Sequence, residues 1–297
     1  MYWLSFVVLA IILIGLIYAR ISEMYLTQTL IIQNLVIFMI VNIPGYSNPY
    51  IINNVFYDLA GRAVYVQQPS MLLGKSHTFI SLMYLHANFM HIIGNLLVLF
   101  FIGIALEDRI GKEYVALVYF PAGIVATLSQ YFVDWGSLVL NVGASGAVMA
   151  LMGTIVYMFP KDKITMFLGP ILMRDVRVDL AVGVFIVMMT VIAFLGGSSN
   201  VAHAAHFGGF GAGMLMGYIY KKYNISKDRE ESLDYSKLKK LAEEQGLMDI
   251  YQKIEDADEN DVKKAWADEL LRKAKCPECG RKLKGSKCEC GYDPFKD

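Results

Sequence analysis

Two groups of side chains in this sequence have types and spacings that can support chemistry. The first centres on Ser145, which stands between Gly143 and Gly146 near the start of a long apolar run. A serine hydroxyl becomes a nucleophile when a base takes its proton, and imidazole is the usual base near neutral pH. The second group consists of all the cysteines in the chain: Cys276, Cys279, Cys288 and Cys290.

A Gly-x-Ser-Gly pattern in an apolar segment also has a simpler explanation. Small residues allow a neighbouring helix to approach closely, and a helical serine can bond to its own backbone. For Ser145 taken alone, this packing interpretation is favoured. The catalytic interpretation therefore depends on polar residues elsewhere in the chain.

The composition indicates a membrane protein with a polar C-terminal part. The 297 residues are 56% hydrophobic, but the charges are unevenly distributed. Residues 1–220 contain nine Lys or Arg and nine Asp or Glu, whereas residues 221–297 contain eighteen of each. A membrane span needs about 20 mainly apolar residues, and the first part contains several such runs. The sequence therefore predicts an all-α polytopic membrane protein followed by a small soluble segment.

We expect seven spans, at about 3–19, 28–43, 77–106, 114–132, 142–159, 178–196 and 201–220. The connection 44–76 is too polar to span and fits an interfacial, partly helical loop. No Lys or Arg precedes the first span, so we expect it to be uncleaved, with its N-terminus outside. The segments then placed inside hold nine Lys or Arg, against two outside. This asymmetry predicts a cell-membrane protein with a cytoplasmic tail.

Polar residues lie near the outer ends of the third, fifth and seventh spans: His86, His91, Asn95, Ser145, His203 and His206. Ionisable residues inside a bilayer usually mark function. His91 and Asn95 are four residues apart, on one helix face, where their donors suit an oxyanion. Polar bonds between helices are the alternative explanation, and for His86 a loop-packing role is favoured. His203 and His206 lack a neighbouring carboxylate and make a weak metal site.

Glycines at four-residue intervals follow His206, at Gly209, Gly213 and Gly217. Such a face packs closely against another helix. The segment that starts at Ser145 has its own small residues, including Gly146. Contact between these two faces would bring His206 near Ser145.

Four motifs in order resemble the rhomboid intramembrane serine proteases over about residues 28–220. They are His86-Ala-Asn-Phe-Met-His91-Ile-Ile-Gly-Asn95, Glu107-Asp-Arg109-Ile-Gly111, Gly143-Ala-Ser145-Gly146 with Ala150-Leu-Met-Gly153, and Ala205-His206-Phe-Gly-Gly209. The resemblance implies a six-helix core at 27–222, with residues 1–26 as an additional N-terminal span. It also implies substrates that are single transmembrane helices with a small residue at the cut.

The resemblance implies a role for each motif residue. Ser145 would be the nucleophile and His206 the general base, without a cofactor. His91, Asn95 and the backbone N–H of Ser145 would form the oxyanion hole. Glu107 and Arg109 would be structural, tying the loop 44–76 or the inner end of the third span. Two positions depart from the family: Met149 replaces a frequent aromatic, and His77 replaces a frequent Trp.

The tail divides into a charged segment, 223–275, and a cysteine-containing segment, 276–297. Apolar residues at helical spacing predict two or three amphipathic helices in the first segment, although a solvated linker is an alternative. Cys-Pro-Glu-Cys-Gly and Cys-Glu-Cys-Gly predict a zinc-ribbon-like module, with the second pair one residue shorter than usual. A cytoplasmic tail lies in a reducing compartment, so disulfides are not expected. We expect structural zinc and a possible cytosolic partner, but no nucleic acid.

These features together predict an intramembrane serine endopeptidase that cuts transmembrane segments near the outer face of the membrane. The alternative is a non-catalytic rhomboid-like protein that binds transmembrane clients. Loss of the serine or the histidine would mark that class, and both Ser145 and His206 are present. A transporter would require buried carboxylates or paired broken helices, whereas the acids of the apolar part lie near span ends.

Overall fold

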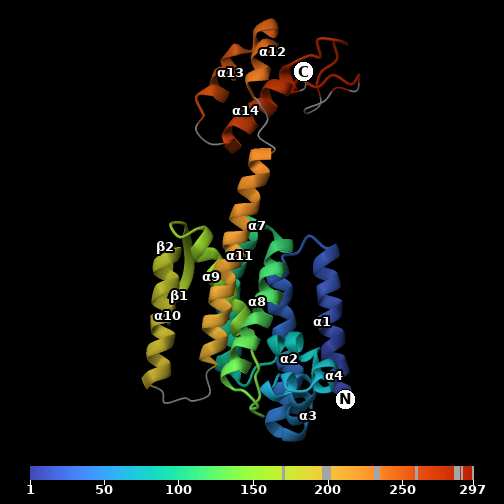
Figure 1. Ribbon diagram of the computed structural model, residues 1–297, viewed down its shortest axis with the longest axis vertical. Helices are drawn as coiled ribbons and strands as arrows, with labels where there is room; N and C mark the ends of the chain where they lie inside the picture. Colours follow the sequence, from blue (N-terminus) through green and yellow to red (C-terminus); the bar gives the residue numbers. More distant parts are fainter. Residues whose placement is uncertain are drawn as a thin grey trace. The chain divides into compact units, whose positions relative to one another are not determined.

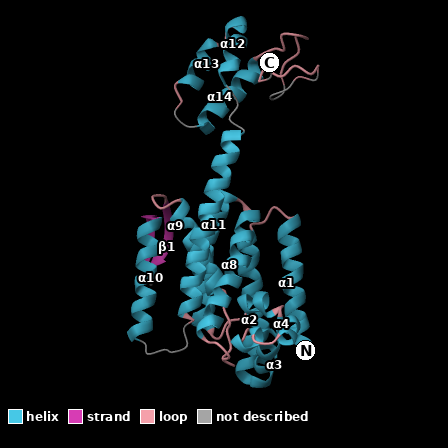
Figure 2. Cartoon of the chain, viewed as in Figure 1, coloured by secondary structure: helices cyan, strands magenta, loops and turns pink. Residues whose placement is uncertain are grey.

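The computed structural model describes residues 1–168, 171–195, 202–230, 235–257, 260–283, 288 and 290–295. The chain divides into two compact units, Met1–Tyr223 and Asn224–Asp297. Both units are mostly helical (Figures 1 and 2), which confirms the predicted fold class.

The first unit contains a bundle of long helices with shorter helical segments between them. Its α-helices are α1 (Trp3–Ile21), α2 (Leu26–Ser47), α3 (Pro49–Leu59), α4 (Pro69–Lys75), α5 (Thr78–Ser81), α6 (Phe89–Val98), α7 (Ile104–Ile110), α8 (Lys112–Val133), α9 (Ser145–Met158), α10 (Val178–Leu195) and α11 (His203–Glu230), which belongs to this unit as far as Tyr223. The remaining helical segments are the 3-10 turns η1 (Ala63–Val66) and η2 (Leu82–Tyr84) and the π-helical η3 (Leu99–Gly103). In Figure 1, helices α1, α8, α9, α10 and α11 run roughly parallel to one another.

The chain is a multi-pass membrane protein. Among the described residues, four helices are long and apolar enough to cross a membrane: Trp3–Ile21, Leu26–Ser47, Phe89–Ile110 and Lys112–Val133. Two shorter apolar helices are Ser145–Met158 and Val178–Val191. Each of the seven predicted spans overlaps a helix of the structure, namely α1, α2, α6 with α7, α8, α9, α10 and α11. Residues 196–201, where the sixth predicted span ends and the seventh begins, lie outside the described residues.

The third predicted span, from His77 to Leu106, is interrupted rather than continuous. Helices α5 and η2 precede a non-helical stretch at 85–88, and α6 begins only at Phe89. The side chain of Asn88 accepts a hydrogen bond from the backbone N–H of His91 at 2.9 Å. An Asn side chain that caps a helix N-terminus replaces a missing backbone partner. A single polar residue therefore sets the start of the membrane helix.

The connection predicted at 44–76 is largely helical. Helix α2 continues through Pro44 to Ser47, and α3, η1 and α4 follow. The Asn48 side chain accepts from the N–H of Tyr50 at 3.2 Å, and Pro49 occupies the first turn of α3. Both residues favour a new helix start, since proline loses no hydrogen bond there.

A β-hairpin between α9 and α10 is absent from the all-α prediction. Strands β1 (Lys163–Leu168) and β2 (Ile171–Arg177) pair antiparallel, with Lys163 opposite Arg177. Ile164 and Met166 are buried, at alternating positions as a strand requires. The apolar alternation is too short to stand out beside the long helical runs, so the sequence did not distinguish it from a loop.

The additional helix α1 is hydrogen-bonded to other helices of the first unit. A side chain of α3 bonds near its start, one of α2 near its middle and one of α8 near its end. The bonds are Tyr2 N and Ser5 Oγ to Asp58 Oδ2 (2.6 and 2.8 Å), Gln33 Nε2 to the carbonyls of Ile11 and Ile12 (2.7 and 2.9 Å), and Lys112 Nζ to the carbonyls of Ala19 and Ser22 (3.0 and 2.7 Å). Helix α1 is therefore part of the bundle.

The second unit has its own small core. Its described helices are η4 (Tyr235–Lys237), α12 (Leu238–Gln245), α13 (Met248–Glu255) and α14 (Asn260–Lys273). Cys276, Leu283 and Cys288 are buried in the same cluster as the apolar side chains of these helices. The segments 223–275 and 276–297, which the sequence presented as separate, therefore share one hydrophobic core.

Candidate active site

The side chains of Ser145 and His206 meet in the structure. Ser145 Oγ and His206 Nε2 lie 3.0 Å apart, a hydrogen-bonding distance. Ser145 is the first residue of α9, and His206 lies in the first turn of α11. With the ring proton on Nδ1, the imidazole Nε2 can accept the proton of the serine hydroxyl.

Direct backbone contact between α9 and α11 brings the two side chains together. A Cβ atom on Gly209 would overlap the carbonyl oxygen of Gly146, and one on Gly213 would overlap that of Ala150. Thr154 Oγ1 also donates to the Gly213 carbonyl at 2.8 Å. Only glycine permits so close an approach. The predicted small-residue faces are therefore the contact surface of these two helices.

The loop before Ser145 places His91 beside the serine. Gly143 has φ of +124°, and a Cβ atom there would lie 2.7 Å from His91 Nε2 and 3.8 Å from Ser145 Oγ. Glycine is thus required by both backbone conformation and space. The Gly143 N–H donates to the Leu82 carbonyl at 2.9 Å, which fixes this loop against η2.

Asn95 lies one turn after His91 on the same helix. Its side chain is 7% exposed, and its Nδ2 donates to the carbonyl of His91 at 3.0 Å. The same amide carries a second N–H. The His91 ring and the Asn95 amide thus lie on one helix face, and the His91 ring adjoins the serine loop.

The remaining polar residues that the sequence singled out have other surroundings. His86 is buried with its ring edge against His91, at 5.0 Å between ring centroids, and neither ring nitrogen has a hydrogen-bond partner among the described residues. His203 is exposed. His77 Nε2 lies 3.0 Å from the Asp58 carbonyl, and Met149 is buried in the bundle core.

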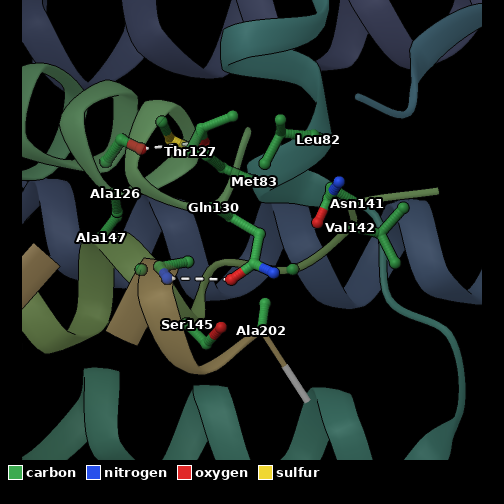
Figure 3. A pocket seen from close by; sticks show the side chains of 14 residues that line it. Leu82, Met83, Ala126, Thr127, Gln130, Asn141, Val142, Ser145, Ala147 and Ala202 are labelled. Carbon is green, nitrogen blue, oxygen red and sulfur yellow. Dashed lines mark hydrogen bonds between the residues drawn. The ribbon is translucent and has the colours of Figure 1, made fainter. Parts of the chain in front are cut away.

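A cavity of about 30 Å³ opens beside Ser145 (Figure 3). This volume is enough for one or two water molecules. Gln130 of α8 also lines the cavity; its Oε1 accepts from the Ala205 N–H at 3.2 Å and its Nε2 donates to Asp134 at 2.9 Å. Gln130 was not among the predicted site residues, although an amide side chain within an apolar span is a detectable signal.

Glu107 and Arg109 act away from the serine. The Glu107 carboxylate is buried and accepts from the N–H groups of Leu26 and Thr27 at 2.6 and 2.8 Å, so it caps α2. Arg109 Nε donates to Asp162 at 2.8 Å, beyond the end of α9. These bonds join the end of the third span to its neighbours, and none of them involves the connection 44–76.

The four cysteines converge in the second unit, where they can hold a metal ion such as zinc. All four Sγ atoms lie within 4.8 Å of one another, with Cys276–Cys290 at 3.5 Å and Cys279–Cys288 at 3.4 Å. A tetrahedral site with Zn–S bonds of about 2.3 Å separates sulfurs by about 3.8 Å, so the donor set fits. A backbone hydrogen bond from Cys290 lowers the pKa of the Cys288 thiol to about 7, whereas, against a backbone hydrogen bond from Tyr292, the hydrogen bond to Cys288 raises the pKa of the Cys290 thiol.

Tight turns position these thiols. Gly280 and Gly291 follow the second and fourth cysteines, with φ of +70° and +99°. The Gly280 N–H donates to the Cys276 carbonyl at 2.8 Å, and the Gly291 N–H donates to the Cys288 carbonyl at 2.9 Å. Positive φ favours glycine at both positions.

Comparison with known proteins identifies the first unit. A family profile described as the Rhomboid domain matches residues 73–223. The chain is 30% identical over 136 residues to the putative rhomboid protease YdcA of Bacillus subtilis, covering 46% of this chain and 62% of that protein. It is also 30% identical to RHOMBOID-like protein 5 of Arabidopsis thaliana (152 residues, 49% of this chain and 44% of that protein) and to Rhomboid-related protein 1 of Caenorhabditis elegans (167 residues, 54% and 44%). The matched region thus covers less than two thirds of the length of each relative.

Proposed function

The chain belongs to the rhomboid family, and from this premise we propose that it is an intramembrane serine endopeptidase. The observation that carries the proposal is the 3.0 Å contact between Ser145 Oγ and His206 Nε2, two groups supplied by different membrane helices. The substrates are single-span membrane proteins, cut within the transmembrane segment near the outer face. The family includes serine proteases, which supports this class of reaction.

In the proposed reaction, His206 takes the proton of Ser145 as Oγ attacks the substrate carbonyl carbon. His206 then gives this proton to the leaving amine, and the C–N bond breaks. A water molecule, deprotonated by His206, then attacks the acyl carbon; the C–Oγ bond breaks, and His206 returns the proton to Ser145 Oγ. Base and nucleophile therefore suffice, without a carboxylate or a cofactor.

The tetrahedral intermediate needs hydrogen-bond donors for its negative oxygen. Ser145 is the first residue of α9, so its backbone N–H has no carbonyl partner within the helix. His91 lies beside this position, and the Asn95 amide is one turn further along the same helix. We assign these three groups to the oxyanion hole, where one donor is typically worth about 10²–10³ in rate.

Both water and an extended substrate must reach the serine inside the membrane. The cavity beside Ser145 is lined in part by the polar side chains of Gln130 and Asn141, which suit water. A helical substrate hides its carbonyl groups in its own hydrogen bonds. We therefore infer that substrates carry small or helix-breaking residues that allow local unwinding near the cut.

The proposed orientation places the N-terminus outside and the second unit in the cytoplasm of the cell. It rests on the excess of Lys and Arg in alternate loops. In this orientation the four-cysteine unit holds structural zinc and is available to a cytosolic protein partner.

The test is labelling and cleavage by the whole protein in lipid nanodiscs. A fluorophosphonate probe should label the wild type and Ser137→Ala, a serine of the loop between α8 and α9, but not Ser145→Ala. Asn95→Ala should cut a single-span substrate about 10²–10³ times more slowly. Full cleavage by Ser145→Ala would refute the proposal. Binding of single-span clients without labelling or cleavage would instead favour the non-catalytic alternative.

A further inference from the structure

A second groove, of about 270 Å³, lies between the third span and the β-hairpin. It shares no lining residue with the cavity at Ser145. One wall is the helical stretch of η3 and α7, and the other is β1. The Phe101 and Phe167 rings meet edge to face at 5.5 Å between centroids, which holds the hairpin against the helix.

The groove changes character along its length. Its apolar part is formed by Phe100, Phe101 and Ile104, and the Phe100 side chain is 49% exposed. Its polar end is formed by Asp108, Arg109 and Lys163. At about 1.5 Å per residue, Phe100 and Arg109 are about 13 Å apart along the helix. This length is close to the depth of one leaflet, which is half of a hydrocarbon core of about 30 Å.

The two cations at the polar end have unused donors. The Lys163 side chain is exposed and makes no ion pair or hydrogen bond within the described part of the chain, while its backbone pairs with Arg177 in the hairpin. Arg109 uses Nε for Asp162 and Nη1 for the Ala105 carbonyl at 2.5 Å. Its Nη2 makes no hydrogen bond among the described residues, so this lining residue keeps free N–H donors.

We propose that this groove binds one membrane phospholipid, with an acyl chain along Phe100 and Ile104 and the phosphate at Lys163 and Arg109. The combination of a long apolar floor with cations at the end of a membrane span matches a lipid that lies in one leaflet. Basic pockets beside transmembrane helices bind lipid headgroups in this way. This proposal is independent of the proposed peptidase activity.

The charges at the groove favour a lipid over a free phosphate ion. The Asp108 carboxylate, which accepts a hydrogen bond from the Tyr25 hydroxyl at 2.5 Å, lies at the same end as the cations. Together with Asp162, which pairs with Arg109 at 2.8 Å, it offsets much of the attraction of these cations for an anion. A phosphate without an apolar chain would therefore bind weakly, whereas a lipid adds the burial of methylene groups against phenyl rings.

The bound lipid has a structural consequence for α10. The hairpin joins α9 to α10, and the N–H groups of Val178 and Asp179 donate to the carbonyls of Asp162 and Pro160 at 2.9 and 3.0 Å. These bonds fix the start of α10 to the base of the hairpin. A lipid that fills the space between the third span and β1 braces the hairpin, and with it the start of this helix.

The experiment is native mass spectrometry of the full chain released from nanodiscs that contain phosphatidylcholine and phosphatidylglycerol. The wild type should retain one phospholipid. Lys163→Ala should lower its occupancy at least tenfold, while Lys163→Arg should keep it. Lys161→Ala is the matched control, because Lys161 is exposed two residues away and does not line the groove.

A second variant, Ala105→Phe, fills the groove without altering its charges and should also exclude the lipid. Its thermal midpoint, measured on the same sample, shows whether it folds; if it does not, the exposed Lys163 variants decide alone. Equal loss with Lys161→Ala, or unchanged occupancy in Lys163→Ala, would overturn the proposal. Displacement of the lipid by millimolar inorganic phosphate would also overturn it, because the site would then recognise phosphate alone.

Discussion

The two units of this protein bring distant side chains together by different physical means. In the first unit, Ser145 and His206 meet because glycines let the backbones of α9 and α11 touch. In the second unit, four thiols converge because tight turns are packed on a small apolar core. Apolar side chains gain little by leaving lipid, whereas in water their burial drives folding. Each unit therefore uses the contacts that its surroundings make effective.

Buried polar side chains show the same contrast. Among the described residues, every buried polar side chain other than cysteine belongs to the first unit, and Asp58, Gln33 and Glu107 are examples. These three side chains hydrogen-bond to the backbone of another helix or its first turn, where they are shielded from water. The second unit instead buries Cys276 and Cys288 among apolar side chains. Its stability should therefore depend on what the thiols bind.

Metal removal should have the largest effect of the tests that address this comparison. Chelation of the zinc-loaded full chain should abolish amide protection throughout α12, α13 and α14, because metal binding supplies about 10 kcal/mol to such folds. The first unit should keep its protection. Hydrogen exchange by mass spectrometry measures both units in one sample. If the three helices stay protected without metal, their apolar core suffices and the contrast fails.

The helix contact of the first unit is tested by Gly213→Ala. The new methyl group would meet the Ala150 carbonyl, so we expect a loss of about 1–3 kcal/mol in stability and weaker probe labelling of Ser145. Gly211→Ala is the matched control, because no atom lies within 4 Å of its added Cβ. Thermal unfolding and labelling should separate the two variants. Equal effects would show that backbone contact is not what positions Ser145 and His206.

The buried hydrogen bonds between helices are tested by Glu107→Ala. Its carboxylate caps α2 through two N–H groups, and such charge-assisted bonds are worth about 1.5–3 kcal/mol. We expect faster hydrogen exchange at the start of α2. Asp108→Ala, which removes only an exposed bond to Tyr25, is the control and should change little. If Glu107→Ala leaves hydrogen exchange at the start of α2 unchanged, helix packing alone holds this end of the bundle.

The smallest expected effect concerns Gln245 in the second unit. Its side-chain amide donates to the Lys275 carbonyl at 2.6 Å and accepts from the Lys275 N–H at 2.7 Å, tying α12 to the first cysteine turn. Because these bonds are exposed, Gln245→Ala should cost only about 1 kcal/mol. Gln252→Ala, on the exposed face of α13, should cost less. Chemical denaturation in a Trp3→Phe, Trp135→Phe background, followed by fluorescence of Trp266, which lies under Lys253 at 4.3 Å, can measure the difference.

The membrane character, the approximate spans and the residue types of both candidate sites were predictable from the amino-acid order. Hydropathy over about 20 residues is a local property, so the apolar runs were visible without the fold. The spacing of His91 and Asn95, and of the cysteine pairs, is also local. The family resemblance followed from such short motifs and is confirmed by the match of residues 73–223.

Features that depend on contacts between distant segments became visible only in the folded chain. The Ser145–His206 distance required two helices to meet, and Gln130 joined the site only through the bond to Ala205. The hairpin buries Ile164 and Met166 against the rest of the first unit, which short local patterns did not predict. The cysteine segment shares a hydrophobic core with α12 to α14. Spacing along one helix can be read locally, whereas the partner across a bundle depends on packing of the whole chain.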